Sequence, residues 1–372
     1  MSLNSRVKLL AMYLPQFHAI PENDEFWGKG FSDWVTVKKA RPLFKGHEQP
    51  KIPLDNRYYD LSKVENIRWQ AEIAKNYGID GFGIYHYWFN NDKNLLTKPA
   101  EILLDNRDID IGFFFAWDNT SWKRSWSNVK GGNAWAPLMD GGVKPNAPEI
   151  LVQYILGDET DWLNHYNYLK KFFKDNRYIK KDNQPIFSIY HYDENIERMC
   201  NYWNSLAKED GFAGICFIFR FDDGKNIPDE RNVFKYEPNY SGWRKLSFLE
   251  KSLNKIKKII QKSGSLNRYN YDVIWKKILK NAKKCTRDNM YHGGFVSYDD
   301  TPRRGKRGIV VENASAEKLK RYLTELMKIS SEQKKEFVFL TAWNEWGEGA
   351  YVEPDCSHGY EFADAIKQSL GE

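Results

Sequence analysis

The sequence has few of the features that mark metal-binding, disulfide-linked or membrane proteins. Its 372 residues include four cysteines, and none of these forms a C-x-x-C pair or accompanies a histidine cluster. These absences argue against a zinc site and a disulfide framework, and they fit a reducing compartment. No run is long and apolar enough for a transmembrane helix, and the apolar residues 8–14 are too few for a secretory signal. We therefore expect a cytoplasmic protein with no metal and no other cofactor.

Sequence motifs that bind nucleotide phosphates are also missing. The first predicted strand is followed by Pro15-Gln16-Phe17-His18 rather than by the G-x-G-x-x-G turn of a dinucleotide-binding fold. The D-x-D sequence Asp108-Ile109-Asp110 precedes a predicted strand, which would place it at the end of a barrel opposite the active site. Both observations weigh against a reaction that uses a nucleotide sugar.

Positive charge is concentrated in one segment. The chain carries +6, but Ser241 to Met290 contains 14 Lys and Arg against 3 Asp and Glu, a net of +11. Apolar residues at helical spacing within it predict an amphipathic helix with a lysine-rich face, namely Leu246, Leu249, Leu253, Ile256 and Ile260. A solvated surface helix is the simplest interpretation. The alternative is peripheral contact with the inner membrane face or with an acidic or lipid-linked glycan. No nucleic-acid-binding motif accompanies the charge, so we expect no nucleic-acid partner.

Short β-rich runs alternate with helical patterns, as in α/β folds with a parallel sheet. The runs are mostly continuously apolar, which is typical of strands buried on both faces. The eight predicted strands cover residues 8–14, 79–87, 111–117, 185–191, 213–220, 234–238, 294–298 and 337–343. No domain boundary is evident. The pattern predicts one (β/α)₈ TIM barrel over residues 1–372, with loop insertions and a basic helical insertion at about 241–290.

Polar and aromatic side chains follow nearly every predicted strand. A (β/α)₈ barrel builds its active site at the C-terminal ends of its strands, so these side chains should converge there. Aromatic residues make up 16% of the chain, and a sugar site needs aromatic platforms edged by hydrogen-bonding groups. The candidate substrate-binding residues are Tyr13, Gln16, His18, His86, Trp88, Trp117, Asp118, Tyr190, Glu237, Asp300, Trp343, Asn344 and Trp346.

Glu345 and Glu348 are the strongest candidates for catalytic residues. Cleavage of a glycosidic bond needs one group to protonate the leaving oxygen and a second carboxylate near the anomeric carbon. Two glutamates three residues apart at a strand end can face one pocket, because the adjacent glycines allow a tight backbone course. The neighbouring tryptophans would desolvate one carboxyl and raise its pKa, which prepares it as an acid. The alternative is a pair of surface glutamates in a glycine-rich loop.

The sequence around these glutamates resembles a known signature. The motif reads Trp343-Asn344-Glu345-Trp346-Gly347-Glu348-Gly349 and is followed by Glu353-Pro354. It resembles the signature of glycoside hydrolase family 99, a family of endo-acting α-mannan enzymes. The wider chain is still more similar to the WbsX-type family, a relative of family 99 from bacterial polysaccharide biosynthesis clusters that is labelled glycosyltransferase. This similarity covers nearly the whole chain and includes residues 13–18, 30–34, 81–88, 115–119 and 300–303.

The resemblance implies a role for each glutamate. In family 99 the second glutamate of the motif, here Glu348, is a general acid/base toward the leaving group. The first, here Glu345, is proposed to deprotonate the 2-hydroxyl of the sugar, which then attacks the anomeric carbon. A 1,2-anhydro sugar forms and the reaction proceeds with net retention. The implied partner is an oligosaccharide or polysaccharide, with α-mannosides as one substrate type.

Three functions are consistent with the sequence. The first is a retaining enzyme that cleaves or transglycosylates glycans with Glu345 and Glu348. The second is a glycosyltransferase of cell-surface polysaccharide biosynthesis (O-antigen or capsule) that uses a nucleotide- or lipid-linked donor. The third is a non-catalytic glycan-binding protein, which needs neither an acid nor a base. Basic residues suited to a diphosphate around the pocket would favour the second function, and a cleft open at both ends would favour the first.

Overall fold

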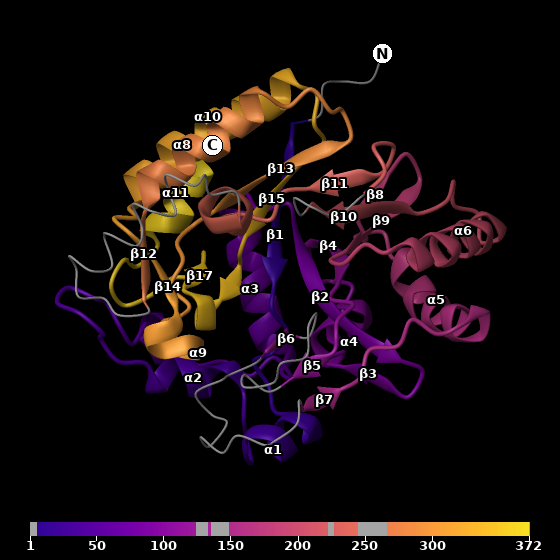
Figure 1. Ribbon diagram of the computed structural model, residues 1–372, viewed down its shortest axis with the longest axis horizontal. Helices are drawn as coiled ribbons and strands as arrows, with labels where there is room; N and C mark the ends of the chain where they lie inside the picture. Colours follow the sequence, from indigo (N-terminus) through magenta and orange to yellow (C-terminus); the bar gives the residue numbers. More distant parts are fainter. Residues whose placement is uncertain (1–5, 124–132, 135–148, 222–226, 245–265, 372) are drawn as a thin grey trace.

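The computed structural model describes residues 6–123, 133–134, 149–221, 227–244 and 266–371 (Figure 1). The amphipathic helix predicted at residues 246–260 lies outside the described residues. Of the predicted insertion at about 241–290, the structure describes strand β12 (Asn267–Asn270), helix α8 (Tyr271–Lys283) and the first residue of strand β13 (Met290–Phe295). The helix α8 packs against β13, so this part of the segment belongs to the repeating β/α pattern.

Eight parallel strands close into a barrel, which confirms the predicted (β/α)₈ fold (Figure 1). They are β1 (Lys8–Tyr13), β2 (Gly81–Asn90), β4 (Gly112–Trp117), β9 (Gln184–Ile189), β10 (Cys216–Arg220), β11 (Asn232–Phe234), β13 (Met290–Phe295) and β15 (Phe337–Thr341). The ring closes because β1 pairs in parallel with both β2 and β15. In this register Leu10 lies beside Gly81 on one side and Phe339 on the other.

Helices in the connections surround the barrel (Figure 1). They are α3 (Val64–Asn76), α4 (Lys98–Asp105), α5 (Glu159–Phe173), α6 (Glu194–Glu209), α8 (Tyr271–Lys283), α10 (Ala316–Glu332) and α11 (Glu361–Ser369). Each buries one apolar stripe; in α10 this stripe includes Leu319, Leu323 and Leu326, at the spacing of one helix face. Asp158 and Asp193 cap the first turns of α5 and α6 through their carboxylates, which fixes where these helices begin.

Shorter elements occupy the connections. Those at the end of the barrel opposite the N-terminus are α1 (Pro21–Trp27), α2 (Asp33–Lys39), α9 (Thr301–Arg304), the 3₁₀ turn η5 (Trp346–Glu348), and the hairpin strands β16 (Asn344–Glu345) and β17 (Ala350–Tyr351) (Figure 1). Others are β3 (Lys93–Leu95), β5 (Trp122–Lys123), β6 (Asn133–Ala134), β7 (Ile150–Val152), β8 (Lys180–Lys181) and β14 (Ile309–Glu312). Because α2, α9 and η5 contact one another, three separate loops meet at this end.

Two predicted strands are displaced from their observed positions. The sixth, predicted at residues 234–238, is β11 and ends at Phe234. The seventh, predicted at residues 294–298, is β13 and begins at Met290. Its glycines obscure its start, because glycine is depleted in strands, yet the barrel requires one of them here. A Cβ atom on Gly293 would lie 1.9 Å from the carbonyl oxygen of Lys235, so only glycine allows the two backbones to approach.

Aromatic side chains fill the barrel interior. The ring of Phe339 lies 4.7 Å from that of Phe234 and 5.9 Å from that of Phe114, measured between centroids. Gly83 makes room for this packing, since a Cβ atom there would lie 2.5 Å from the ring of Phe114. The interior is thus a packed core, and ligands must bind at the rim of the barrel.

Candidate active site

The two candidate glutamates lie on a hairpin that follows the last barrel strand. In the antiparallel pair β16–β17, Glu345 is opposite Ala350. The turn η5 then carries Glu348, and Gly349 ends it in the left-handed conformation with φ of 56°. A Cβ atom at Gly349 would lie 2.9 Å from the backbone nitrogen of Asp299, so this position needs glycine for both its conformation and its surroundings.

A single arginine on α9 joins the two glutamates. Arg303 Nη2 donates to Glu345 Oε2 at 3.1 Å, and Nη1 donates to Glu348 Oε1 at 2.8 Å. Its Nη2 also donates to Asp33 Oδ2 at 3.0 Å, at the start of α2. Asp33 accepts a further bond from the backbone nitrogen of Gly347 at 3.1 Å. One guanidinium therefore holds three carboxylates, two from the hairpin after β15 and one from the start of α2.

This arrangement leaves an excess of negative charge in a buried site. The side chain of Glu345 is 5% exposed and that of Glu348 is 21% exposed. Burial raises the pKa of Glu345 well above its ordinary value; Arg303 opposes the rise, and the charges of Glu348 and Asp33 add to it. Three carboxylates around one cation favour the retention of one proton, which is the state that an acid/base pair requires.

Tyrosines surround the glutamates. Burial raises the pKa of Tyr85, Tyr87, Tyr236 and Tyr298, and the negative charge of at least one of the two glutamates raises it further in each case. The hydroxyl oxygens of Tyr85 and Tyr236 are 2.8 Å apart. These phenols combine an apolar ring with a hydroxyl group, which is the chemistry that sugar rings and their hydroxyls require.

Three of the predicted substrate-binding residues belong to this group. Two of them are Asp118 and Tyr190. The charge of Asp118 adds to the effect of burial on the pKa values of Tyr87 and Tyr190, so these three side chains share one environment. Asp300 directly precedes α9, and burial raises its pKa to about 6, with Glu348 contributing to the rise.

Three other predicted residues lie between the barrel and helix α5. His86 Nε2 is 2.8 Å from His165 Nε2 of α5, and the ring of Trp88 stacks on that of His165 at 4.3 Å. Trp117 packs edge-on against the same histidine at 5.0 Å. Burial lowers the pKa of His86 to about 3, so this cluster is uncharged. The structure does not bring these side chains to the two glutamates.

Tyr13 and Glu237 also point away from the glutamate pair. Tyr13 donates to Gln70 of α3 at 2.7 Å. Glu237 accepts bonds from the backbone nitrogen and the hydroxyl of Ser241 at 2.9 and 2.6 Å. Burial raises the pKa of Glu237 to about 7. Both residues follow strand ends, but their contacts lie in the layer outside the barrel.

The remaining residues of the terminal motif support the hairpin. Asn344 Nδ2 donates to the carbonyl oxygen of Leu14 at 3.0 Å, and its Oδ1 accepts from the nitrogen of Leu14 at 2.7 Å. Trp346 Nε1 donates to Glu353 at 2.6 Å, and Trp343 is fully buried. Burial raises the pKa of Glu353 to about 7. These three predicted substrate-binding residues therefore hold the loop in place through internal contacts.

Gln16 and His18 are the predicted residues that follow β1. The carbonyl oxygen of Gln16 accepts a bond from the backbone nitrogen of Asp33 at 3.1 Å. The side-chain amide of Gln16 is buried and has no hydrogen-bond partner among the residues that the structure describes. His18 is also buried, and burial lowers its pKa. An unpaired buried amide is unfavourable, so Gln16 stays a candidate for contact with a ligand.

Sequence reasoning missed several residues of the site, among them Asp33, Arg303, Tyr85 and Tyr236. The segments 30–34 and 300–303 had already been singled out by their family resemblance, and this was the available signal for Asp33 and Arg303. The two tyrosines directly precede His86 and Glu237, so the prediction chose the neighbouring position on the opposite face.

The described residues form neither a metal-binding cluster nor a membrane-spanning helix. Within the described parts of the chain, no group of three or more His, Cys, Asp or Glu side chains is placed to hold a metal ion. No helix among these residues combines the length and apolarity needed to cross a membrane.

The fold is shared with solved structures of glycoside hydrolases. The GH99 endo-α-mannosidase from Bacteroides thetaiotaomicron superposes with a TM-score of 0.53 at 12% identity, covering 98% of this chain and 95% of that chain. A structure described as a glycoside hydrolase-like protein gives a TM-score of 0.58 at 13% identity, covering 100% and 95% of the two chains. At these identities the likeness establishes the fold alone.

Sequence comparison assigns the family. Two strains of Xanthomonas campestris pv. campestris have relatives named "Uncharacterized protein WxcX", each 28% identical over 375 residues that cover 97% of this chain. The match covers 49% of each relative, so this chain spans about half their length. The model of a family described as "Glycosyltransferase WbsX" matches residues 9–366, from the first barrel strand to the last helix. The chain therefore belongs to the WbsX glycosyltransferase family, a carbohydrate-active family with the barrel fold of glycoside hydrolase family 99.

Proposed function

We propose that this chain transfers glycosyl groups of an oligosaccharide or bacterial polysaccharide with retention of configuration, using Glu345 and Glu348 as its catalytic carboxylates. The observation that carries the proposal is the single guanidinium of Arg303, which contacts both carboxylates at the rim of the barrel. The likeness to family 99 makes α-mannosides the first substrates to test.

In the first step the buried carboxylate acts on the sugar itself. Glu345, ionised, accepts the proton of the sugar 2-hydroxyl, and the resulting oxygen attacks the anomeric carbon. The bond to the leaving oxygen breaks as Glu348 gives its proton to that oxygen, and a 1,2-anhydro sugar forms. The raised pKa of Glu345 supports this role, because a carboxylate with a pKa near the working pH is an effective base.

In the second step an acceptor opens the anhydro ring. An acceptor hydroxyl attacks the anomeric carbon and gives its proton to Glu348, while Glu345 returns a proton to the sugar 2-oxygen. Both carboxyl groups are then back in their starting states, and two inversions at the anomeric carbon give net retention. Water as acceptor gives hydrolysis and a sugar hydroxyl gives transfer; the glycosyltransferase description of the family favours transfer to a sugar.

The test compares the protein with Glu345→Gln and Glu348→Gln variants. Each is incubated with α-linked manno-oligosaccharides and a panel of other bacterial-type oligosaccharides, and the products and their anomeric configuration are followed by NMR. We expect turnover with retention in the wild type, and a loss of about 100-fold or more in each variant, because each removes one acid/base group. Turnover by either variant at the wild-type rate would refute the assignment.

Glu325→Gln on the outer helix α10 serves as the matched control. Its carboxylate forms a surface ion pair with Lys283 at 2.6 Å and lies outside the site, so the same chemical change there should leave turnover unaltered. A wild-type protein that binds glycans and turns over none of them, alone or with added sugar acceptors, would instead be a binding protein.

A further inference from the structure

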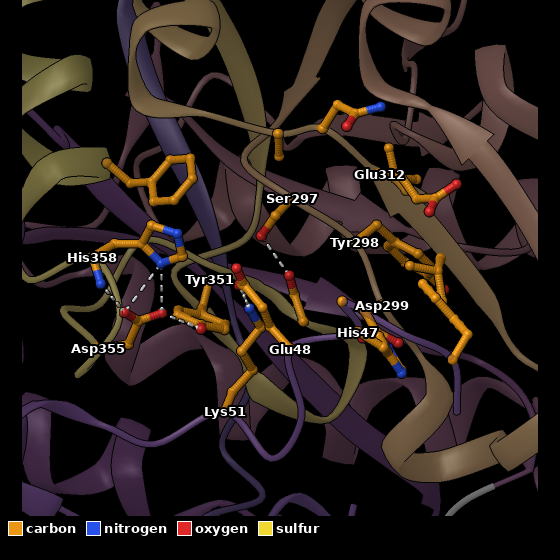
Figure 2. Close-up of a pocket in the computed structure, with 18 residues that line it drawn as sticks. His47, Glu48, Lys51, Ser297, Tyr298, Asp299, Glu312, Tyr351, Asp355 and His358 are labelled. Carbon is orange, nitrogen blue, oxygen red and sulfur yellow. Dashed lines mark hydrogen bonds and ion pairs between the residues drawn. The ribbon is translucent and has the colours of Figure 1, made fainter. Parts of the chain in front are cut away.

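A pocket lies beside the hairpin that carries Glu345 and Glu348, and neither glutamate lines it (Figure 2). Its volume is about 300 Å³, at the lower end of the range for small-molecule sites. It lies at the C-terminal side of the seventh and eighth barrel strands, where its wall includes Ser297 and Asp299 after β13 and Gly349 after η5. This is the end of a (β/α)₈ barrel at which ligands bind.

The inner wall of the pocket is the back of the loop that carries Glu348. Ser297 Oγ donates to the carbonyl oxygen of Gly349 at 2.5 Å (Figure 2). The backbone nitrogen of Asp299 donates to the carbonyl oxygen of Glu348 at 2.6 Å. A ligand in the pocket would therefore lie against the loop of a proposed catalytic residue.

Two of the carboxylates that line the pocket already accept hydrogen bonds from protein donors. Asp299 accepts bonds from His47 Nε2 and Gln49 Nε2, both at 2.7 Å, and from the hydroxyl of Thr301 at 2.6 Å. His47 Nδ1 accepts a bond from a backbone nitrogen, so Nε2 carries the proton that is donated to Asp299. The hydrogen bonds from His47, Thr301 and Gln49 outweigh burial and lower the pKa of Asp299. Asp299 therefore keeps its negative charge and shapes the wall.

Asp355 is held in a similar way on the opposite wall. It accepts the hydroxyl of Tyr351 at 2.5 Å and the backbone nitrogens of Ser357 and His358 at 2.9 and 2.7 Å. The hydrogen bond between its carboxylate and His358 raises the pKa of that imidazole (Figure 2). These contacts make the wall rigid and preorganised.

The other polar groups offer both donors and acceptors to a ligand. Glu48 and Lys51 form an ion pair at 2.8 Å, and the Glu48 side chain is 61% exposed. Glu312 lies across the pocket from them (Figure 2), and Asn313 also lines the pocket. The rings of Phe44 and other aromatic residues add apolar surface. Hydroxyl groups and the apolar C–H face of a sugar ring match such a mixed lining.

The net charge of the pocket lining indicates whether its ligand is an uncharged sugar or an anion. Barrels often bind phosphate beside their seventh and eighth strands. Among the described residues that line this pocket, however, four carboxylates face one lysine, namely Glu48, Asp299, Glu312, Asp355 and Lys51. Glu312 also pairs with Arg268, which lies outside the lining. Even with this arginine counted and His358 protonated, negative charge remains in excess, which disfavours phosphate, nucleotides and uronic acids.

We propose that this pocket binds an uncharged sugar unit of a glycan, at a position separate from the reacting sugar. The identity of the ligand rests on the proposed glycan activity, whereas the pocket and its charge do not. The site gives the protein a second contact with its glycan, behind the loop of Glu348.

The test measures sugar binding by ligand-observed saturation-transfer NMR, using the full chain with Glu345→Gln and Glu348→Gln so that nothing is turned over. The uncharged probes are methyl α-mannoside, methyl β-glucoside and N-acetylglucosamine; the anionic probes are glucuronic acid and inorganic phosphate. We expect at least one uncharged sugar to bind saturably and more tightly than either anion. Adding Ala314→Trp, which fills the pocket from its wall, should weaken that binding by about tenfold or more.

Glu48→Ala provides a second variant, because this largely exposed side chain can be removed without unfolding the protein. It should also weaken sugar binding, whereas Glu325→Ala, which removes a comparable surface carboxylate on α10, should not. The proposal is overturned if no uncharged sugar binds, if an anion binds more tightly, or if Ala314→Trp and Glu48→Ala leave binding unchanged. A protein that binds sugar here but turns over no glycan would refute the catalytic proposal and leave this one standing.

Discussion

Replacing Arg303 by methionine tests whether the site is held together by one cation. The arginine side chain is 8% exposed, and its partners Asp33 and Glu345 are 1% and 5% exposed. Methionine keeps much of the side-chain volume but leaves these two carboxylates buried without their cation. Loss of one partner from a buried ion pair costs about 3–5 kcal/mol, so we expect Arg303→Met to lower the free energy of unfolding by that amount at neutral pH.

The loss should depend on pH in a defined direction. Without Arg303, which opposes the effect of burial, the pKa of Glu345 in the folded state should rise further above its value in the unfolded chain. A group with a raised folded-state pKa contributes stability below its unfolded pKa and loses that contribution as the pH rises. The difference between wild type and variant should therefore be largest at about pH 8 and should shrink toward about pH 5.

Urea unfolding monitored by tryptophan fluorescence at both pH values measures this difference. Arg68→Met is the matched control, since it removes an ion pair with Asp108 in which the side chains are 38% and 65% exposed. The control should cost less than about 1 kcal/mol, as is typical of surface pairs. A cost for Arg303→Met that is equally small, or that does not change with pH, would refute the view that Arg303 stabilises the buried carboxylates around it.

Two further predictions concern groups outside the ion-pair cluster. Burial raises the pKa of Glu237 to about 7, so the wild type should lose stability as the pH rises through this value. Glu237→Gln should flatten this part of the curve of melting temperature against pH. Identical curves for the variant and the wild type would contradict this expectation. Gly349→Ala should cost about 1–2 kcal/mol for the left-handed conformation alone. It should cost more than Gly211→Ala, where φ is 88° and a Cβ atom would meet nothing within 4 Å, because it also crowds Asp299. Equal unfolding free energies for the two alanine variants would show that the contact has no effect.

The barrel could be predicted from the sequence because every strand is buried on both faces. A continuous apolar run of this kind can be recognised in the sequence without knowledge of the packing. All eight predicted runs correspond to barrel strands. The same property hides which residues face the interior. In β2, Tyr85 lies near the glutamates and His86 packs against α5, yet both are buried. Alternation places them on opposite faces, but the sequence alone does not say which face is inside.

The terminal glutamates could be predicted because one short motif carries both. Their partners could not, because Asp33 and Arg303 come from separate loops whose meeting depends on the closed barrel. The sequence alone predicts that an arginine in a loop is exposed, because it does not show the three carboxylates that surround this arginine in the fold. Similarly, tryptophans beside glutamates suggest sugar platforms, whereas Trp346 in the structure bonds to Glu353 and packs the loop.

The two hydrogen bonds between Asn344 and Leu14 have a consequence for the order of assembly. They connect residues 330 positions apart, so the hairpin with both glutamates can be fixed only after the last strand has docked beside the first. Contacts this distant in the chain form late, because closing such a loop costs entropy before any contact is gained. A partly folded or partly synthesised barrel would therefore have no working site. The two glutamates reach their places beside Arg303 only as the ring closes, so the proposed activity would appear only in the complete barrel.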